Sequence, residues 1–267
     1  MIVQTIRSLI FYLLFLGQTT ILATLLGTIT LFKKGWFPFG WTIAKFWANS
    51  IVFLMRWVVG IRTEVTGMEN IPEGGCIIAA KHQSDWDIFA LITKSGRPSF
   101  ITKKELMDIP FFGWSARSMD AISIDRKKGS EAMPAMVEEA RQAVARGCRI
   151  IIFPEGTRRQ PLAEPAYRFG VAKLYAQLNV PIVPVALNSG LFWSRNAKIL
   201  WPGTARAKFL PPIPAGLDPT KMHKRMVEVI EAETDKLIAE SVNEGLSRPI
   251  SAQLRERINA LKARLKA

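Results

Sequence analysis

His82 and Asp87 are the residues whose types and spacing most clearly indicate chemistry. They lie in the stretch AKHQSDWD, between the apolar runs at 76–80 and 88–92, and His82 is one of only two histidines in the chain. On a regular helix, residues five positions apart are rotated by about 140°, so the two side chains would not face each other. They can meet if His82 lies in the turn after a strand and Asp87 lies in the first turn of the next helix, for which Ser84 is a plausible N-cap.

Such a pair is typical of general-base catalysis. Asp87 would accept a hydrogen bond from one ring nitrogen of His82, and the other nitrogen would be free to take a proton from a substrate hydroxyl. The turn also places His82 at the carboxyl end of a strand, where open α/β sheets bind their ligands. The alternative is that Asp87 only caps the helix and that His82 is an ordinary surface residue.

A second stretch, IIIFPEGTRR at 150–159, predicts an anion site. It begins as an apolar strand, and Gly156 then permits a tight turn with exposed main-chain N–H groups. Arg158 adds a planar, permanently charged group that is suited to phosphate. Two other strand candidates also end in basic residues, Lys103 and Arg126. One such residue alone is usually a solvated charge, but three cationic strand ends beside a His/Asp turn predict an anion-binding crevice.

The elements that would position these residues alternate between strands and helices. Short β-branched runs separated by helical stretches imply crossover connections, so we expect an α/β fold with a mostly parallel sheet flanked by helices. Pro181 and Pro184 predict that the sixth strand is irregular or near a sheet edge at its start. The strand candidates are 63–67, 76–80, 99–102, 121–125, 149–153, 181–188 and 205–210, and the helix candidates are 86–94, 130–146, 167–178, 220–244 and 251–265.

The N-terminal quarter of the chain differs from the rest. Residues 8–32 carry no charge and exceed the roughly 20 residues that a membrane helix needs. A second apolar segment contains four tryptophans, which favour the headgroup boundary, and Lys45 and Arg56, which would be unfavourable at mid-bilayer. We therefore expect a membrane-associated helical hairpin at 1–61 that dips into one leaflet or lies in the interface, with two full spans as the alternative.

Residues 62–267 are expected to form the α/β domain, which ends in basic C-terminal helices. The last of these helices has an apolar stripe opposite a basic face. It would either dock on the protein through the stripe or bind an anionic lipid or an acidic carrier directly.

The overall charge and apolar content together favour one class of partner. A formal net charge of +14 points to an anionic partner, and 49% hydrophobic residues are unusual for a nucleic-acid-binding protein. A membrane surface explains both values. Cys76 and Cys148 each begin an apolar run, so we expect buried thiols, and neither fits a metal-ligand spacing.

Four blocks occur in a recognisable order along the chain. They are His-x4-Asp at 82–87, AISIDR at 121–126, FPEGTR at 153–158 and VPIVPV at 180–185. Together they resemble the glycerolipid acyltransferase family, and specifically its bacterial 1-acyl-glycerol-3-phosphate acyltransferases. The resemblance covers about 62–215, and an N-terminal helix pair embedded in the membrane is also typical of the family. The chain departs from the family pattern at Asp120 or Ala121 and at Ser123, and Arg168 stands where a lysine is common; the charge pattern is kept.

The resemblance implies transfer of an acyl chain from a thioester to the free 2-hydroxyl of a lysophosphatidic acid, giving phosphatidic acid. His82 would be the general base, and Asp87 would orient the ring and stabilise the imidazolium. We expect no acyl-enzyme, because no serine or cysteine lies in a nucleophile context such as Gly-x-Ser-x-Gly. The family pattern assigns the glycerol phosphate to Arg126, Glu155, Gly156, Thr157 and Arg158.

Within that site, Glu155 would orient an arginine or contact the glycerol. Lys103, or main-chain N–H groups near Gly156, would stabilise the oxyanion. No metal or cofactor is implied. The partners would be lysophosphatidic acid, acyl-CoA or acyl carrier protein, and membrane lipid, but no nucleic acid. The expected location is the cell inner membrane, with the active site facing the cytoplasm.

Two alternatives stay open. A related acyltransferase would use glycerol-3-phosphate or another lysolipid as the acceptor. A non-catalytic lipid-binding protein could share the same scaffold.

Overall fold

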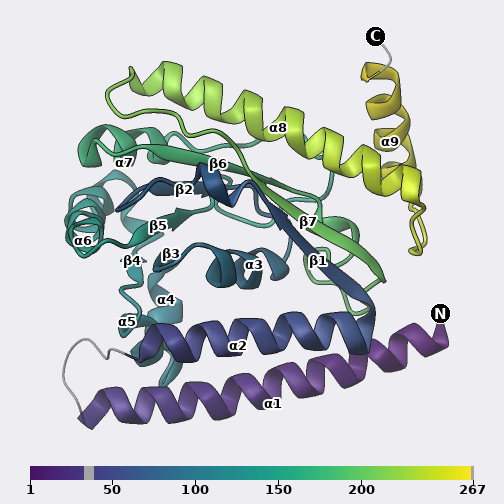
Figure 1. Cartoon of the computed structure of the whole chain (residues 1–267), viewed down its shortest axis with the longest axis horizontal. Helices are drawn as coiled ribbons and strands as arrows, with labels where there is room; N and C mark the ends of the chain where they lie inside the picture. Colours follow the sequence, from purple (N-terminus) through teal and green to yellow (C-terminus); the bar gives the residue numbers. More distant parts are fainter. Residues whose placement is uncertain (33–38, 266–267) are drawn as a thin grey trace.

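A single mixed sheet lies at the centre of the molecule (Figure 1). The computed structural model describes residues 1–32 and 39–265, with the backbone only for 30–32, 126, 128 and 130, and within this part seven strands are joined in the order β1-β7-β6-β2-β5-β3-β4. Each neighbouring pair is parallel except β6 with β7, so the predicted mostly parallel α/β fold is confirmed. Every predicted strand is present, with ends shifted by at most two residues. The strands are β1 Ile61–Thr66, β2 Ile77–Ala80, β3 Pro98–Lys103, β4 Ile122–Ile124, β5 Arg149–Ile152, β6 Ile182–Leu187 and β7 Gly203–Phe209.

Helices cover both faces of this sheet. On one face α3 lies against the sheet and the pair α1 and α2 lies beyond it, whereas α6, α7 and α8 cover the other face (Figure 1). The five predicted helices are confirmed as α3, α6, α7, α8 and α9, with ends shifted by at most three residues. The α-helices are α1 Ile2–Phe32, α2 Gly40–Leu54, α3 Trp86–Lys94, α4 Lys104–Met107, α5 Phe112–Arg117, α6 Met133–Ala145, α7 Gly170–Leu178, α8 Pro219–Glu244 and α9 Ala252–Arg264; a π-helix, η1, spans Met55–Val59, and short 3-10 helices are η2 Met68–Asn70, η3 Arg126–Ala132 and η4 Ser189–Leu191.

The central strands are apolar on both sides because both faces are covered. All residues of β2 and β6 are buried. Alternate residues of a strand point to opposite faces. Ile78 and Ala80 therefore join the layer that contains α2 and α3, while Ile77 and Ala79 join the layer that contains α6, α7 and α8. The same alternation decides where the residues just after β2 point.

The expectation that Pro181 and Pro184 place the sixth strand near an edge is wrong. β6 lies between β7 and β2, with Ala79 opposite Pro184. The carbonyl of Pro184 accepts the N–H of Leu210 at 2.9 Å, on the side away from β2. The N–H and C=O of one strand residue point to the same side, so the missing N–H also faces away from β2 and no ladder bond to β2 is lost.

Two short helices, α4 and α5, follow β3 and were not predicted. They have four and six residues, and helical periodicity is read over longer windows. α5 packs against α1. A Cβ on Gly27 would lie 2.7 Å from the Cα of Phe111, so this close approach of the two segments requires glycine in α1.

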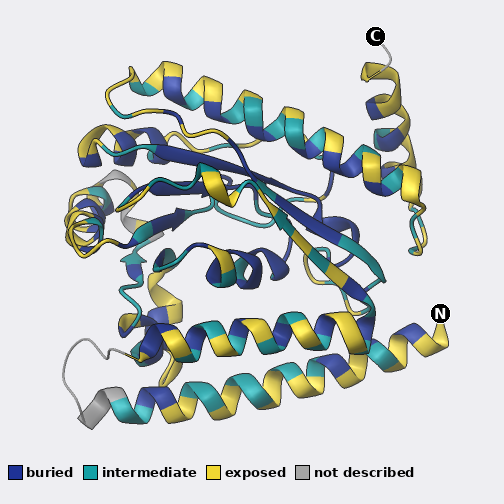
Figure 2. Ribbon diagram, in the orientation of Figure 1, coloured by how far each residue is buried: buried dark blue, intermediate teal, exposed yellow. Residues whose placement is uncertain are grey.

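α1 and α2 present apolar side chains outward. Among the described residues one helix, over Ile2–Ile29, is long and apolar enough to cross a membrane. Figure 2 shows exposed residues along the outer side of α1 and α2. The large exposed apolar side chains there are Met1, Ile2, Val3, Ile6, Leu9, Ile10, Leu13, Leu14, Leu16, Ile21 and Leu25 before or on α1, and Phe46, Phe53 and Trp57 on α2 and η1.

Of the tryptophans expected at a headgroup boundary, only Trp57 is exposed in the described part. Trp41 is buried, Trp47 is partly buried and donates to the hydroxyl of Thr19 at 3.0 Å, and Trp36 lies outside the described residues. η1 ends at Val59, Gly60 follows it with a φ of +90°, and β1 begins at Ile61. That 1–61 and 62–267 are separate units stays a prediction.

The C-terminal helices α8 and α9 pack on the rest of the structure. α8 packs against β6 and α7, and α9 contacts α8. Leu254, Ile258 and Leu261 are buried, and Arg264 pairs with Asp235 at 2.9 Å. The apolar stripe of the last predicted helix is therefore docked on the protein, except for Leu265 at its end, which is exposed.

Candidate active site

His82 and Asp87 meet across the turn between β2 and α3, in the geometry that their spacing predicts. Nδ1 of His82 lies 2.9 Å from Oδ2 of Asp87. The imidazole is 14% exposed, whereas the Asp87 side chain is fully buried. The N-cap of α3 is Asp85, one residue after the expected Ser84, and the hydroxyl of Ser84 accepts the N–H of Trp86 at 3.0 Å.

Asp87 accepts hydrogen bonds on both carboxylate oxygens. Oδ2 also accepts the main-chain N–H groups of Gln83 at 2.8 Å and Ser84 at 3.0 Å, and Oδ1 accepts the hydroxyl of Ser189 in η4. An ionised carboxylate can only accept hydrogen bonds, so the imidazole must be the donor in its contact with Oδ2. This network therefore assigns the ring proton to Nδ1. The lone pair then lies on Nε2, which has no hydrogen-bond partner among the described residues.

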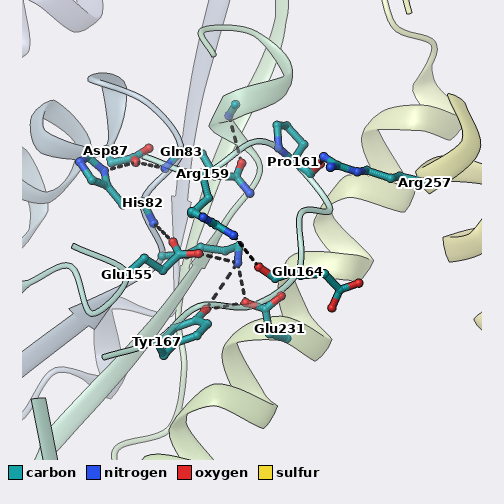
Figure 3. Close-up of polar contacts among 12 residues, drawn as sticks. His82, Gln83, Asp87, Glu155, Arg159, Pro161, Glu164, Tyr167, Glu231 and Arg257 are labelled. Atoms are coloured by element: carbon teal, nitrogen blue, oxygen red, sulfur yellow. Dashed lines mark hydrogen bonds and ion pairs between the residues drawn. The ribbon is translucent and has the colours of Figure 1, made fainter. Parts of the chain in front are cut away.

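The segment 153–159 contacts both the ring and the main chain of His82. The ring of Phe153 stacks on the imidazole, with the centroids 3.9 Å apart and an interplanar angle of 16°. Glu155 Oε2 accepts the His82 N–H at 2.9 Å, and the His82 carbonyl accepts the N–H of Arg159 at 2.8 Å. Figure 3 shows Asp87 at the imidazole and Glu155 at the main chain of the same residue.

Glu155 is placed differently from the expectation that it orients an arginine or contacts the glycerol. It is 3% exposed, and its Oε1 lies 3.4 Å from Nζ of Lys81. Burial raises the pKa of its carboxyl, and the Lys81 charge and the His82 N–H act in the opposite direction. Its two oxygens thus face a lysine and a main-chain amide, and it is absent from the cavity wall.

A cavity of about 750 Å³ opens beside His82. Its wall is mostly apolar and takes side chains from α1, α2, α3, β3 and α6, among them Phe15, Trp47 and Phe100. Both N-terminal helices therefore help to enclose the space next to the imidazole. Among the described side chains, the basic ones on the wall are Lys103, Arg158, Arg168 and Arg195, and the acidic one is Asp85.

Most of the predicted anion-binding residues line this cavity. Gly156, which has a φ of +68°, Thr157 and Arg158 follow Pro154 along its wall, and Lys103 reaches it from the end of β3. The N–H of Gly156 donates to the carbonyl of Phe153 at 2.9 Å, so it is not free to bind an oxyanion. The side chain of Arg126 lies outside the described residues.

Arg158 forms an ion pair with Asp85 at the cavity wall. Burial raises the pKa of Asp85, and the guanidinium of Arg158 lowers it. An anionic ligand that binds Arg158 therefore competes with a carboxylate that burial already disfavours as an ion.

The sequence prediction assigned no role to four residues that the fold brings to this site. Lys81 and Ser189 lie behind the His82–Asp87 pair, and Arg168 and Arg195 lie on the cavity wall. Ser189 directly follows the predicted sixth strand, so its position at a strand end was the available signal. Arg195 lies in the irregular stretch between η4 and β7, where no local pattern marks it.

Comparison with known proteins decides the family. A model of the acyltransferase family matches residues 62–188, which include all four sequence blocks. The 1-acyl-sn-glycerol-3-phosphate acyltransferase of Pseudomonas aeruginosa is 32% identical over 241 residues, which cover 89% of this chain and 92% of that protein. The chain belongs to the acyltransferase family.

Two further proteins are similar to this chain, one in sequence and one in fold. The human 1-acyl-sn-glycerol-3-phosphate acyltransferase alpha is 31% identical over 169 residues, which cover 62% of this chain and 60% of the human protein. The crystal structure of the 1-acyl-sn-glycerophosphate acyltransferase of Thermotoga maritima shares the fold, with a TM-score of 0.68 and 24% identity over 88% of this chain and 97% of that one.

Proposed function

We propose that this acyltransferase moves an acyl chain from acyl-CoA or acyl-acyl carrier protein to the sn-2 hydroxyl of 1-acyl-glycerol-3-phosphate. The observation that carries the proposal is a His82–Asp87 pair at the wall of an apolar cavity that also holds four basic side chains. The names of the Pseudomonas and human relatives agree with this acceptor.

His82 acts as the general base in this proposal. With Nδ1–H bound to Asp87, Nε2 takes the proton of the acceptor hydroxyl as the oxygen attacks the thioester carbon. When the tetrahedral intermediate collapses, the C–S bond breaks and the imidazolium returns the proton to the leaving thiolate. Asp87 stabilises the imidazolium between these two steps, and no acyl-enzyme forms.

The phosphate of the acceptor binds the basic residues of the cavity wall. Arg158 offers a bidentate donor beside Gly156 and Thr157, and Arg126 is expected to add a second one. Arg195 forms no ion pair or hydrogen bond with any residue in the described ranges, so its charge is available to the substrate. Lys103 remains the candidate side chain for the oxyanion of the intermediate.

The acyl chains occupy the apolar part of the cavity. Each buried CH₂ group contributes about 0.8 kcal/mol, so a wall made of α1, α2 and α3 side chains supports binding of long chains. The donor is an acidic carrier, coenzyme A or acyl carrier protein, and both are compatible with a net charge of +14.

The enzyme works at a membrane in this proposal. α1 and α2 dip into one leaflet of the cell inner membrane through their exposed apolar side chains, with the active site facing the cytoplasm. Arg56 is exposed at the end of this layer and would remain in the headgroup region. The acceptor and the product are lipids, so this placement lets them enter the cavity without crossing water.

The test is thiol release by the detergent-solubilised enzyme given an acyl-CoA and 1-acyl-glycerol-3-phosphate. We expect turnover by the wild type and a loss of about 10²–10⁴-fold in kcat for His82→Ala. His223→Gln, at the only other histidine of the chain, is the matched control and should keep wild-type turnover.

Parallel reactions with glycerol-3-phosphate and with other lysolipids separate the alternatives. Turnover only with one of those acceptors would favour a related acyltransferase, and none with any acceptor would favour a lipid-binding protein. Activity of His82→Ala within tenfold of wild type would overturn the assignment of the base.

A further inference from the structure

Lys81, which directly precedes the proposed base, is charged yet only 2% exposed. It continues the pairing of β2, because its N–H donates to the carbonyl of Val185 at 3.0 Å. Strand alternation therefore points Lys81 and His82 to opposite faces of the sheet. His82 faces the cavity, while Lys81 reaches toward α8 and is absent from the cavity wall. A lysine in such a position has no access to substrate.

The ammonium of Lys81 lies in a cluster of three polar side chains. It forms an ion pair with Glu231 of α8, and its Nζ lies 3.4 Å from Oε1 of Glu155 and 3.5 Å from the hydroxyl of Tyr167. Tyr167 in turn donates to Glu231. Figure 3 shows Glu155, Tyr167 and Glu231 converging on one point below His82. The cluster thus combines one ammonium with two carboxylates.

Through Glu155, this cluster also contacts the main chain of His82, the proposed base. Glu155 uses one oxygen for Lys81 and the other for the N–H of His82, at 2.9 Å. Burial raises the pKa of Glu155, and the charge of Lys81 is the largest influence that lowers it. Without Lys81, a carboxylate that is 3% exposed would face the negative charge of Glu231 with no cation in contact. It would then take up a proton or move, and the His82 N–H would lose its charged acceptor.

We propose that Lys81 is a positioning residue: it holds Glu155 as an ionised acceptor for the His82 N–H, and so keeps the imidazole against Asp87 and Phe153. Glu231 and Tyr167 complete the surroundings of the ammonium and link α8 to the placement of the base. This inference rests on the proposed function, because it matters for catalysis only if His82 is the base.

Lys81→Met removes the charge and keeps a long apolar side chain in the buried space. We expect kcat to fall by about 10- to 100-fold, the size of one charge-assisted hydrogen bond, while KM for the lysolipid stays within twofold. Lys173→Met, at an exposed lysine of α7, is the matched control and should change neither constant.

The double variant Lys81→Met with Glu155→Gln gives the sharper readout. A neutral amide needs no counter-charge, and its oxygen can still accept from the His82 N–H. We expect kcat of the double variant to lie within threefold of Glu155→Gln alone, because the lysine then has no carboxylate to hold. A purely structural lysine would instead lower the melting temperature and leave kcat per folded enzyme unchanged, and that result would overturn the proposal.

The remaining outcomes are also decisive. A double variant that folds but is tenfold or more slower than Glu155→Gln alone would show that the lysine does not act through Glu155. Failure of both Lys81 variants to fold would assign the residue to folding and overturn its positioning role. Wild-type enzyme without lysolipid turnover would instead refute the proposed function, whatever the Lys81 variants do.

Discussion

Asp87→Asn is the most direct probe of the catalytic pair, because it removes one charge and almost no volume. The amide oxygen can take the place of Oδ2 and accept from Nδ1 of His82 and from the main-chain N–H groups of Gln83 and Ser84. The amide nitrogen would then face Ser189, whose hydroxyl can turn and accept. Every hydrogen bond can therefore be kept, with only the one to Ser189 reversed in direction, and the negative charge beside the ring is lost.

The size of the effect follows from that charge. A hydrogen bond to a charged group contributes about 1.5–3 kcal/mol and a neutral one about 0.5–1.5 kcal/mol. The imidazolium that forms during the reaction also loses an opposite charge, and such a pair is worth at most about 4 kcal/mol at 4 Å in an effective dielectric of about 20. We therefore expect a loss of about 2–4 kcal/mol in the transition state, which is about 30- to 1000-fold in kcat.

The assay is thiol release with saturating acyl-CoA and varied 1-acyl-glycerol-3-phosphate. KM should change little, because Asp87 is fully buried and does not line the cavity. Asp218→Asn is the matched control: Asp218 caps α8 by accepting the N–H of Lys221, and asparagine is an equally good cap. A kcat of Asp87→Asn within fivefold of wild type would refute the claim that this carboxylate supports a charged imidazole.

Two other predictions concern the cavity and the thiols. Arg195→Gln should raise KM for 1-acyl-glycerol-3-phosphate about tenfold with kcat within threefold, because a charged donor to phosphate is lost and no carboxylate is left unpaired. Arg255→Gln, on the exposed side of α9, is the control. An unchanged KM for Arg195→Gln would exclude Arg195 from the phosphate site. Burial raises the pKa of Cys76 and Cys148 from 9.0 to about 11, so at pH 8 only about a thousandth of each thiol is thiolate. Iodoacetamide should therefore modify both cysteines slowly in the folded enzyme, faster as the pH rises toward 11, and fully after denaturation; labelling of the native enzyme at the rate of a free thiol would contradict their burial.

The sequence alone determined the features that depend on neighbouring residues. The strands β2, β5 and β6 are mostly apolar runs, and α3 begins at Trp86, directly after the polar residues Ser84 and Asp85 and one residue before Asp87. Five positions then suffice to bring His82 and Asp87 together, because the turn that joins them is local. The charges at the ends of β3 and β5 were readable for the same reason, since parallel strands end at one edge of a sheet.

Only the tertiary structure decided which distant groups complete the site. Ser189 reaches Asp87 across 102 positions, and Glu231 reaches Lys81 across 150. The cavity wall of α1 and α2 likewise depends on how these helices pack against α3 and α5. Glu155 shows the limit most clearly. Its motif suggested a substrate contact, but its side chain pairs with Lys81, which directly follows the neighbouring strand β2. Local periodicity fixes which face of an element is apolar, whereas partners across the sheet are fixed by strand order and register, which no short stretch of sequence encodes.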